Sequence, residues 1–397
     1  MKNNSISINK MVIGVFFLIW ATFAFVLIGT IGRYLSLVLG MYCIMSSVVF
    51  GKIDSRSFFF ILKAIAVFLM YIFLAFELNQ RTTSIINITF GLICLLLIIA
   101  GYLYSKNTRV DKTIDSKIVV LIAILSILGA FELYRMQASL LLEVGRGLGE
   151  ESLNAVGVAY VCGQVFLLLF WLYIQMRNLI LKILLITAMV ANGVALLITE
   201  SRGAVVFLIV TLIWFYKERF KFLLNLKSIV VIALVGTLLL LTFKDNVILQ
   251  DKIDDVSNRF ESAFDHLQGI NTDASLQERS SLQSDFYEDY DQMVFGYEGY
   301  KPYPHNQIIE IYMRWGIFGI PVLLISLLSF IKSIRYPSRK DFSQVSFSYL
   351  IISVFFFSYL QSMSSLSLEM NRMLWFGFGF FITELFKRKI KIVKVNG

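Results

Sequence analysis

The sequence predicts an all-α protein that crosses a membrane many times. The 397-residue chain is 57% hydrophobic and only 16% charged, and its mean hydropathy is +0.74. Average globular chains carry about 25% charged residues. Apolar runs of about 20 residues recur along almost the whole length, and each could cross a hydrocarbon layer of about 30 Å as a helix. No soluble core could bury so many runs.

About twelve membrane spans are expected. They lie near residues 11–30, 34–50, 58–78, 83–104, 117–134, 153–175, 178–199, 203–216, 225–243, 306–331, 343–362 and 371–386. This layout divides the chain into three parts. A bundle of nine spans covers 1–243, a large polar loop covers 244–305, and 306–397 holds the last three spans and a basic tail.

The distribution of charge predicts the orientation. With the N-terminus in the cytoplasm, the termini and short loops on that side hold 23 of the 36 basic residues and six of the 27 acidic residues. Short cytoplasmic loops carry an excess of Lys and Arg, so both termini are predicted to be cytoplasmic. The net charge of +9 is not clustered on a soluble face, and a nucleic acid is therefore not an expected partner.

The large loop is predicted to face outward and to contain short amphipathic helices. Residues 244–304 hold thirteen acidic and five basic side chains. Apolar residues recur there at helical spacing, first over 253–267 and more loosely over 276–286. Helices that lie along the membrane surface would bury these two apolar stripes.

Arg202 is a candidate anion-binding residue. It follows Ser201 in LLITESRGAVVFLIV, where one span ends and the next begins. Ser201 suits a helix N-cap, which places Arg202 in the first turn, where a cation opposes the helix dipole. A guanidinium beside free N–H groups is suited to an anion. The alternative is an interfacial arginine that reaches toward water.

His305 is a candidate acid–base residue. It follows two prolines in KPYPHNQIIEIYMRWGIFG and precedes Asn306 and a predicted helix that carries Glu310 and Arg314. A near-neutral pKa would let a histidine accept a proton from a sugar hydroxyl. The alternative is a loop histidine that caps the helix. The glycines at 316 and 319 are expected to allow another helix to approach closely.

Arg279 is one of few cations in the acidic loop. It could bind a substrate anion or form a salt bridge with Glu278 or Asp285. The Asp289-Tyr290-Asp291 triplet has the short carboxylate pattern of metal-dependent sugar-nucleotide transferases. It lacks the strand–helix alternation that such a site needs. No metal and no cofactor are therefore predicted.

Four pieces of sequence occur in an order that resembles the O-antigen ligase and O-antigen/capsule polymerase superfamily. They are SRGA at 201–204, LQERSSL at 276–282, MVFGYEGY at 293–300 and HNQIIEIYMRWGIFGIPVLL at 305–324. The resemblance implies a GT-C-like fold and metal-independent glycosyl transfer from undecaprenyl-diphosphate-linked glycans at the outer face of the bacterial inner membrane. It also implies that Arg202 and Arg279 bind the diphosphate and that His305 activates the acceptor or holds the leaving group.

Physical chemistry agrees with these implied roles. The diphosphate gains charge as the glycosidic bond breaks, and without a metal arginines would stabilise it. Attack by the acceptor hydroxyl from the opposite face would invert the anomeric carbon. Further phosphate or sugar contacts are expected from residues of second rank, which are Arg81, Arg135, Arg314, Arg372, Asn306 and Tyr300.

Three functions remain open from the sequence. A polymerase would add the growing glycan to another lipid-linked repeat unit, and a ligase would move it onto a lipid A core. Polymerases are favoured because they are the more numerous and more divergent group. A flippase is disfavoured because no internal repeat is found and the unusual charges gather at one face. The expected partners are the lipid-linked glycan, the bilayer, a chain-length regulator and a flippase.

Overall fold

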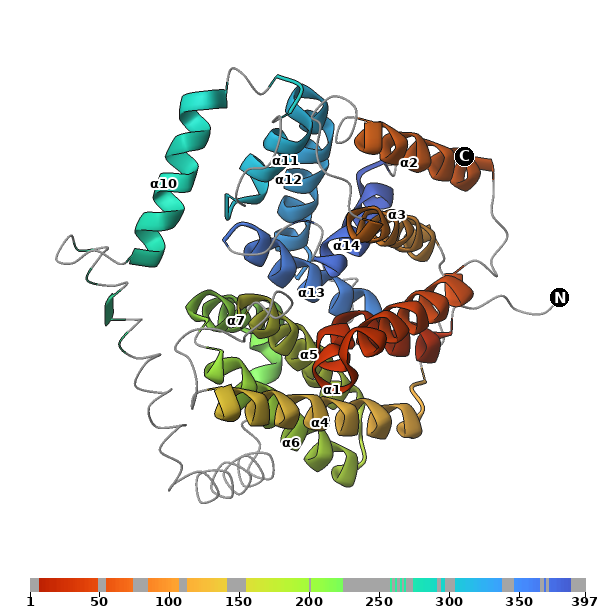
Figure 1. Cartoon of the computed structure of the whole chain (residues 1–397). Helices are drawn as coiled ribbons and strands as arrows, with labels where there is room; N and C mark the ends of the chain where they lie inside the picture. The colour runs from red at the N-terminus through yellow and green to blue at the C-terminus, as the bar shows by residue number, and fades with distance from the viewer. Residues whose placement is uncertain are drawn as a thin grey trace, which may run out of the picture.

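The structure is a computed structural model of the chain, and every described element is helical (Figure 1). It describes residues 7–48, 55–73, 85–106, 113–140, 155–199, 201–223, 274–290, 294–296, 304–337, 346–364, 368 and 371–386, with five single positions between 258 and 268. The elements are α1 (Ile8–Val48), α2 (Ser55–Phe73), α3 (Ile85–Lys106), α4 (Ser116–Leu140), α5 (Ala155–Gln175), α6 (Leu179–Ile198), α7 (Arg202–Leu223), α10 (Ala274–Asp289), α11 (Gln307–Trp315), the 3-10 helix η3 (Gly316–Gly319), α12 (Ile320–Arg335), α13 (Phe347–Ser362) and α14 (Arg372–Phe386).

Helix α1 is folded back on itself at Gly29. This residue has φ 71° and ψ −158°, a conformation that glycine adopts at little cost. The two arms run antiparallel, because the Ser36 hydroxyl donates to the Phe17 carbonyl over 2.7 Å and Gly14 faces Gly40 across the contact. The predicted first two spans, 11–30 and 34–50, correspond to these two arms.

Most other predicted spans coincide with helices to within a few residues. This holds for α2 to α7, α13 and α14, whereas the predicted span at 225–243 lies outside the described residues. Five of the described helical segments are long and apolar enough to cross a membrane, and four shorter helices are also apolar. The chain is therefore a helical membrane protein.

The predicted span at 306–331 coincides with the apolar segment Gln307–Arg335, but the α-helix is interrupted within that segment. Gly316 has φ 54° and ends α11, after which the 3-10 turn η3 leads into α12. The amide of Ile317 donates to the carbonyl of Val294 over 2.9 Å, and a Cβ on Gly316 would lie 2.0 Å from that oxygen. The missing side chain of Gly316 therefore leaves room for the backbone of the 294–296 turn. The sequence had suggested that a neighbouring helix packs there.

Helix α10 confirms the second predicted amphipathic segment as a helix. It stands beside the bundle in Figure 1 and reaches α11 near its C-terminal end. There the Phe286 ring meets the Tyr312 ring edge-on, with centroids 5.8 Å apart. The first predicted segment, 253–267, lies almost wholly outside the described residues.

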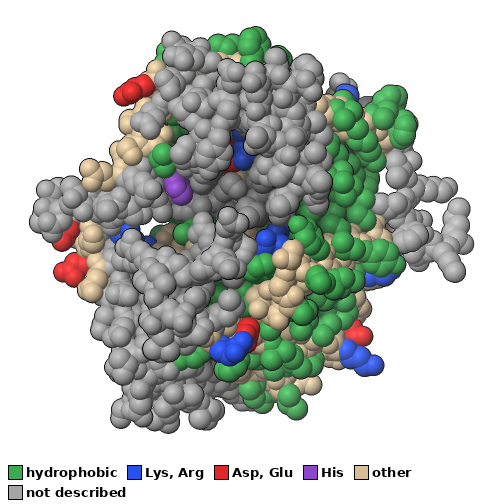
Figure 2. All heavy atoms as spheres, in the orientation of Figure 1, with side chains coloured by type: hydrophobic (Ala, Val, Ile, Leu, Met, Phe, Trp, Pro, Cys, Tyr) green, Lys and Arg blue, Asp and Glu red, His purple; other side chains and the backbone are tan. Residues whose placement is uncertain are grey.

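The outside of the bundle is apolar, as a lipid environment requires. Large apolar side chains on α1, α2, α4, α6, α7 and α12 face outward, and Ile31 and Ile180 are 72% and 75% exposed. Figure 2 shows hydrophobic side chains gathered along one side of the molecule. The interior is also apolar and rich in aromatic rings.

Helices α3 and α14 make the closest contact in the bundle at two glycines. A Cβ on Gly101 would lie 2.0 Å from the carbonyl oxygen of Phe376, and one on Gly379 would lie 2.0 Å from that of Ile98. Small residues let membrane helices approach until their backbones touch, and dispersion forces then stabilise the pair. This contact positions α14, which forms part of the cleft described below.

We predict that Gly379→Ala destabilises the protein, because the added methyl group pushes α14 away from α3. Overpacking of this kind costs about 1–3 kcal/mol. The matched control is Gly157→Ala on α5, where a Cβ meets nothing within 4 Å. Thermal unfolding in detergent should show a lower Tm for Gly379→Ala and an unchanged or higher Tm for Gly157→Ala. Equal Tm values would contradict the close contact.

Candidate functional site

Polar groups from several helices meet at the connection between α13 and α14. We call Ser362, Ser364, Leu368 and Asn371 of this connection the α13–α14 corner. The side-chain amide of Asn371 donates to the carbonyl of Ser358 over 2.6 Å, which holds the start of α14 against α13. The corner then receives contacts from α5, α7 and α11, so it joins parts of the chain that are far apart in sequence.

The start of α11 is attached to the corner by Gln307. This buried side chain donates from Nε2 to the Ser326 hydroxyl of α12 over 2.5 Å, and its Oε1 accepts from the Ser362 hydroxyl. Asn306 caps the helix, because its Oδ1 accepts from the amides of Ile308 and Ile309 at 2.9 and 3.4 Å. The position of residues 305–307 is thus set by a cap on one side and two buried hydrogen bonds on the other.

His305 has a left-handed backbone conformation, with φ 52°. It is the only non-glycine residue with positive φ in the described part of the chain. Such conformations cost energy in residues with a Cβ and gather at functional sites. The side chain is partly exposed, and its Nδ1 is buried. Figure 2 shows a histidine side chain with Lys and Arg side chains around a hollow in this face of the molecule.

The N-terminus of α7 lies at the same corner. The helix begins at Arg202, as predicted, and the amide of Val205 donates to the carbonyl of Ser201 over 3.3 Å. A Cβ on Gly203 would lie 3.8 Å from the hydroxyls of both Ser364 and Tyr160. The first turn of α7, with its partial positive charge, is therefore close to the corner that also holds the start of α11.

A second contact between α11 and the corner involves an ion pair near the C-terminal end of α11. Arg314 Nη2 lies 2.5 Å from Glu310 Oε1, and the side chains are 17% and 4% exposed. The second carboxylate oxygen of Glu310 accepts from the amide of Leu368 over 3.0 Å. Because both oxygens are engaged, Glu310 orients Arg314 and fixes the corner at the same time.

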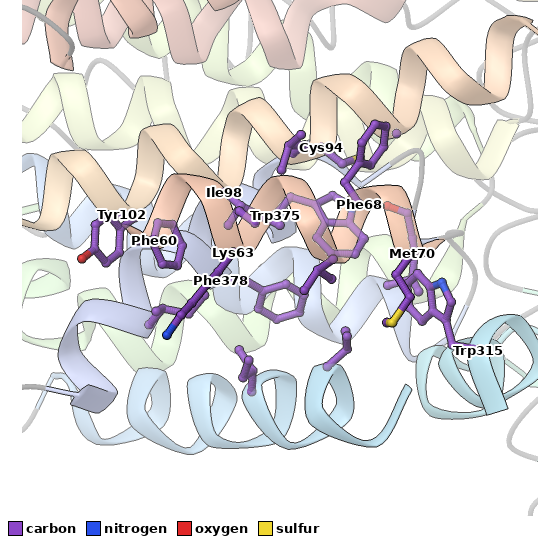
Figure 3. Close-up of a pocket in the computed structure, with 18 of the residues that line it drawn as sticks. Phe60, Lys63, Phe68, Met70, Cys94, Ile98, Tyr102, Trp315, Trp375 and Phe378 are labelled. Atoms are coloured by element: carbon purple, nitrogen blue, oxygen red, sulfur yellow. Dashed lines mark hydrogen bonds between the residues drawn. The ribbon is translucent and has the colours of Figure 1, made fainter. Parts of the chain in front are cut away.

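A large apolar cleft begins beside this ion pair. It has a volume of about 1370 Å³ and runs between α2, α3, α12 and α14. Arg314 and Trp315 line one end, where the Trp375 indole donates to the carbonyl of Leu368 over 2.7 Å. Figure 3 shows Trp315 and Met70 at this end and Phe60 and Tyr102 at the other. A guanidinium at the mouth of an apolar cleft suits a lipid with an anionic headgroup.

The other predicted site residues have different positions. Arg135 on α4 is exposed and binds Glu132 through Nε and Nη2 at 2.5–3.0 Å. Arg372 donates from Nη1 to the carbonyl of Leu18 over 3.0 Å. Position 279 lies on α10, but its side chain is outside the described residues, as are Arg81 and Tyr300. Among the predicted residues, the structure thus gathers Arg202, His305, Asn306 and Arg314 around the corner.

Sequence reasoning missed Arg33, a neighbour of Arg372, and the corner itself. Arg33, in the second arm of α1, holds its guanidinium 4.3 Å from the Phe25 ring centroid and is close enough to Arg372 for the two charges to interact. The signal of the corner was visible as QSMSSLSLEMN, a polar run at 361–371 between two apolar spans.

Fold and site together define the class, a helical membrane protein with a polar corner beside a lipid-sized cleft. No family model matches the chain, and no curated protein and no solved structure matches it either. The function proposed below is therefore inferred from the residues of this chain alone.

We predict strong energetic coupling between Glu310 and Arg314. A double-mutant cycle of Glu310→Ala and Arg314→Ala, read by thermal unfolding, should give a coupling of about 1–3 kcal/mol, because each single change leaves a largely buried charge without its partner. The control cycle uses Glu132→Ala and Arg135→Ala on α4, where the arginine side chain is 69% exposed and water screens the pair. Coupling that is no larger at Glu310–Arg314 than in the control would contradict a structural role for the pair.

Proposed function

We propose that this protein is a polysaccharide polymerase that joins undecaprenyl-diphosphate-linked repeat units at the outer face of the bacterial inner membrane. The observation that carries the proposal is the convergence of the first turn of α7, the start of α11 and Arg314 around a polar corner beside an apolar cleft. A lipid-linked sugar has the matching parts, which are a long apolar tail, an anionic diphosphate and a polar glycan.

The binding mode follows from this match. The polyprenyl tail lies in the cleft, where aromatic and aliphatic side chains replace lipid contacts. The diphosphate then falls at the Arg314 end, and Arg202 at the N-terminus of α7 contributes a second guanidinium. Arg279 supplies a third from α10, a helix that packs on α11 through Phe286, two turns after position 279. The glycan extends outward from the corner.

The reaction is a single displacement. A hydroxyl of the acceptor sugar attacks the anomeric carbon of the donor while the bond from that carbon to the diphosphate oxygen breaks. His305 accepts the hydroxyl proton, and the diphosphate leaves with both bonding electrons. The arginines stabilise the charge that develops on the leaving group. Attack from the face opposite the leaving group inverts the configuration.

The membrane setting is part of the same proposal. About twelve spans in a GT-C-like arrangement place the corner on the outer side and both termini in the cytoplasm. The described helices support this orientation, since Lys106, Lys332 and Arg335 end α3 and α12 at the side away from the corner. A flippase that delivers the donor and a chain-length regulator are the expected partner proteins.

We predict that Arg202→Ala, Arg279→Ala and His305→Ala each reduce chain extension by at least about tenfold, because each removes charge stabilisation or proton transfer in the transition state. Arg202→Lys should also be impaired, since an ammonium lacks the fork of donors. The assay uses purified protein and undecaprenyl-diphosphate-linked repeat units without any ion gradient. The control is Arg177→Ala, at the opposite end of α5 from Tyr160, which should extend chains normally. Normal polymer from all three alanine variants would overturn the site.

A deletion strain separates the related functions. A core that carries a single repeat unit identifies the lost activity as a polymerase. A core without repeats, together with accumulated long lipid-linked glycan, would identify a ligase instead. A purified protein that forms no glycosidic bond but moves the lipid-linked glycan across vesicles would identify a flippase.

We predict that the two roles of His305 can be separated. Asparagine tolerates the left-handed conformation, so His305→Asn should keep the wild-type Tm and lose chain extension. His305→Val should lose chain extension and also lower the Tm, because a β-branched residue with positive φ costs about 1–3 kcal/mol. If His305→Asn extends chains at the wild-type rate, position 305 matters only for its backbone conformation, and the histidine is not an acid–base group.

A further inference from the structure

The end of the cleft away from Arg314 carries two lysines. Lys63 on α2 and Lys106 at the end of α3 both line the cleft. Figure 3 shows Lys63 beside Phe60 and Tyr102, at the opposite end from Trp315. The cleft is therefore apolar along its length and basic at both ends.

The two lysines are held around a pair of stacked rings. The Phe60 and Tyr102 rings lie 3.7 Å apart with an interplanar angle of 11°. Lys106 Nζ is 5.2 Å from the Tyr102 ring centroid and donates to the Ser57 hydroxyl over 3.1 Å. Lys63 follows Phe60 by one helical turn on the same face of α2. The ring stack and Ser57 thus hold Lys106 in place at the cleft, with Lys63 on the facing helix.

This arrangement differs from that of ordinary basic residues at helix ends. Lys117 lies in the first turn of α4 and Lys217 in the last third of α7. Both are exposed, as Lys63 is, but neither lines the cleft. Such residues meet the surface charge of a membrane without selecting a lipid. At Lys63 and Lys106 the ammonium groups instead stand at the mouth of a cavity that accepts apolar chains.

We propose that this end of the cleft binds one anionic phospholipid. Its phosphate lies between Lys63 and Lys106, and its acyl chains enter the cleft past the Phe60–Tyr102 stack. Charge selects the lipid, because a zwitterionic headgroup brings a cation that the lysines repel. The orientation proposed above makes this a lipid of the cytoplasmic leaflet. The two lysines do not belong to the α13–α14 corner, so the headgroup site is separate from the groups proposed for glycosyl transfer, and only the assignment to a leaflet rests on the proposed function.

The test is lipid retention by the full chain in native mass spectrometry. Purified protein in detergent is titrated with phosphatidylglycerol or with phosphatidylethanolamine that has the same acyl chains. The wild type should bind the first lipid about 30-fold more tightly, the effect of two lysines near a membrane surface. Lys63→Gln with Lys106→Gln should abolish this preference. The control pair, Lys117→Gln with Lys217→Gln, removes the same charge and should retain it.

A second variant tests whether the acyl chains enter the cleft. Ala64 lines the cleft one residue after Lys63, and Ala64→Trp fills space there without changing charge. It should weaken phosphatidylglycerol binding about tenfold or more while the Tm stays near that of the wild type. Equal binding of the two lipids by the wild type, equal loss in the two lysine pairs, or full binding by a folded Ala64→Trp protein would each overturn the proposal. The lysine variants leave the groups proposed for glycosyl transfer unchanged, so their lipid binding can fail while chain extension persists, whereas Ala64→Trp also narrows the cleft proposed for the polyprenyl tail.

Discussion

The buried polar contacts between α11 and the α13–α14 corner are the constraint on which the rest of the site depends. Gln307 and Glu310 lie one turn apart and reach Ser326, Ser362 and Leu368 from one short helix. The helices of this bundle are apolar both where they face each other and where they face lipid. Dispersion forces alone would therefore fix the position of one helix against another only weakly. Paired polar groups specify it strongly, because any shift would leave a donor or acceptor unsatisfied where no water is available.

This constraint has consequences in two directions along α11. At its start, the contacts hold His305 in a left-handed conformation and keep Asn306 in the cap. At its end, the ion pair holds Arg314 at the mouth of the cleft, and Gly316 then lets the chain turn over the 294–296 segment. One helix of nine residues therefore positions the proposed base, the proposed phosphate contact and the end of the cleft proposed for the lipid-linked donor.

The cleft depends on a different kind of packing. Glycines let α3 and α14 touch backbone to backbone, which leaves large side chains on neighbouring faces to line an open space against α2 and α12. Basic groups at both ends make the space suitable for amphiphiles that enter from either side. The proposed donor and the proposed phospholipid would share its apolar walls but not its charged ends.

Much of the fold could be predicted from the sequence, because apolar runs that cross a bilayer have little choice but to be helical. The first residues of α7 and α11 could also be predicted, because Ser201 and Asn306 are residue types that favour the position just before a helix. The interruption at Gly316 was not readable. A glycine inside an apolar run either packs against a helix or breaks one, and the presence of the 294–296 backbone decides which. Arg202, His305 and Arg314 could be selected from the sequence because charged and titratable side chains are rare in an apolar chain. Gln307 and the serines at 362 and 364 are common residue types, and only their contacts in the folded chain make them part of the site.

The sequence by itself determined the class of this protein, most of its helices and the few charged residues that stand out in an apolar chain. Those properties follow from transfer free energies and local backbone preferences, which act residue by residue. Only the tertiary structure decided that the starts of α7 and α11 meet at one corner, that Glu310 orients Arg314, and that a cleft with lysines at its far end opens beside them. These features require contacts between residues that are far apart along the chain, and such contacts are set by packing.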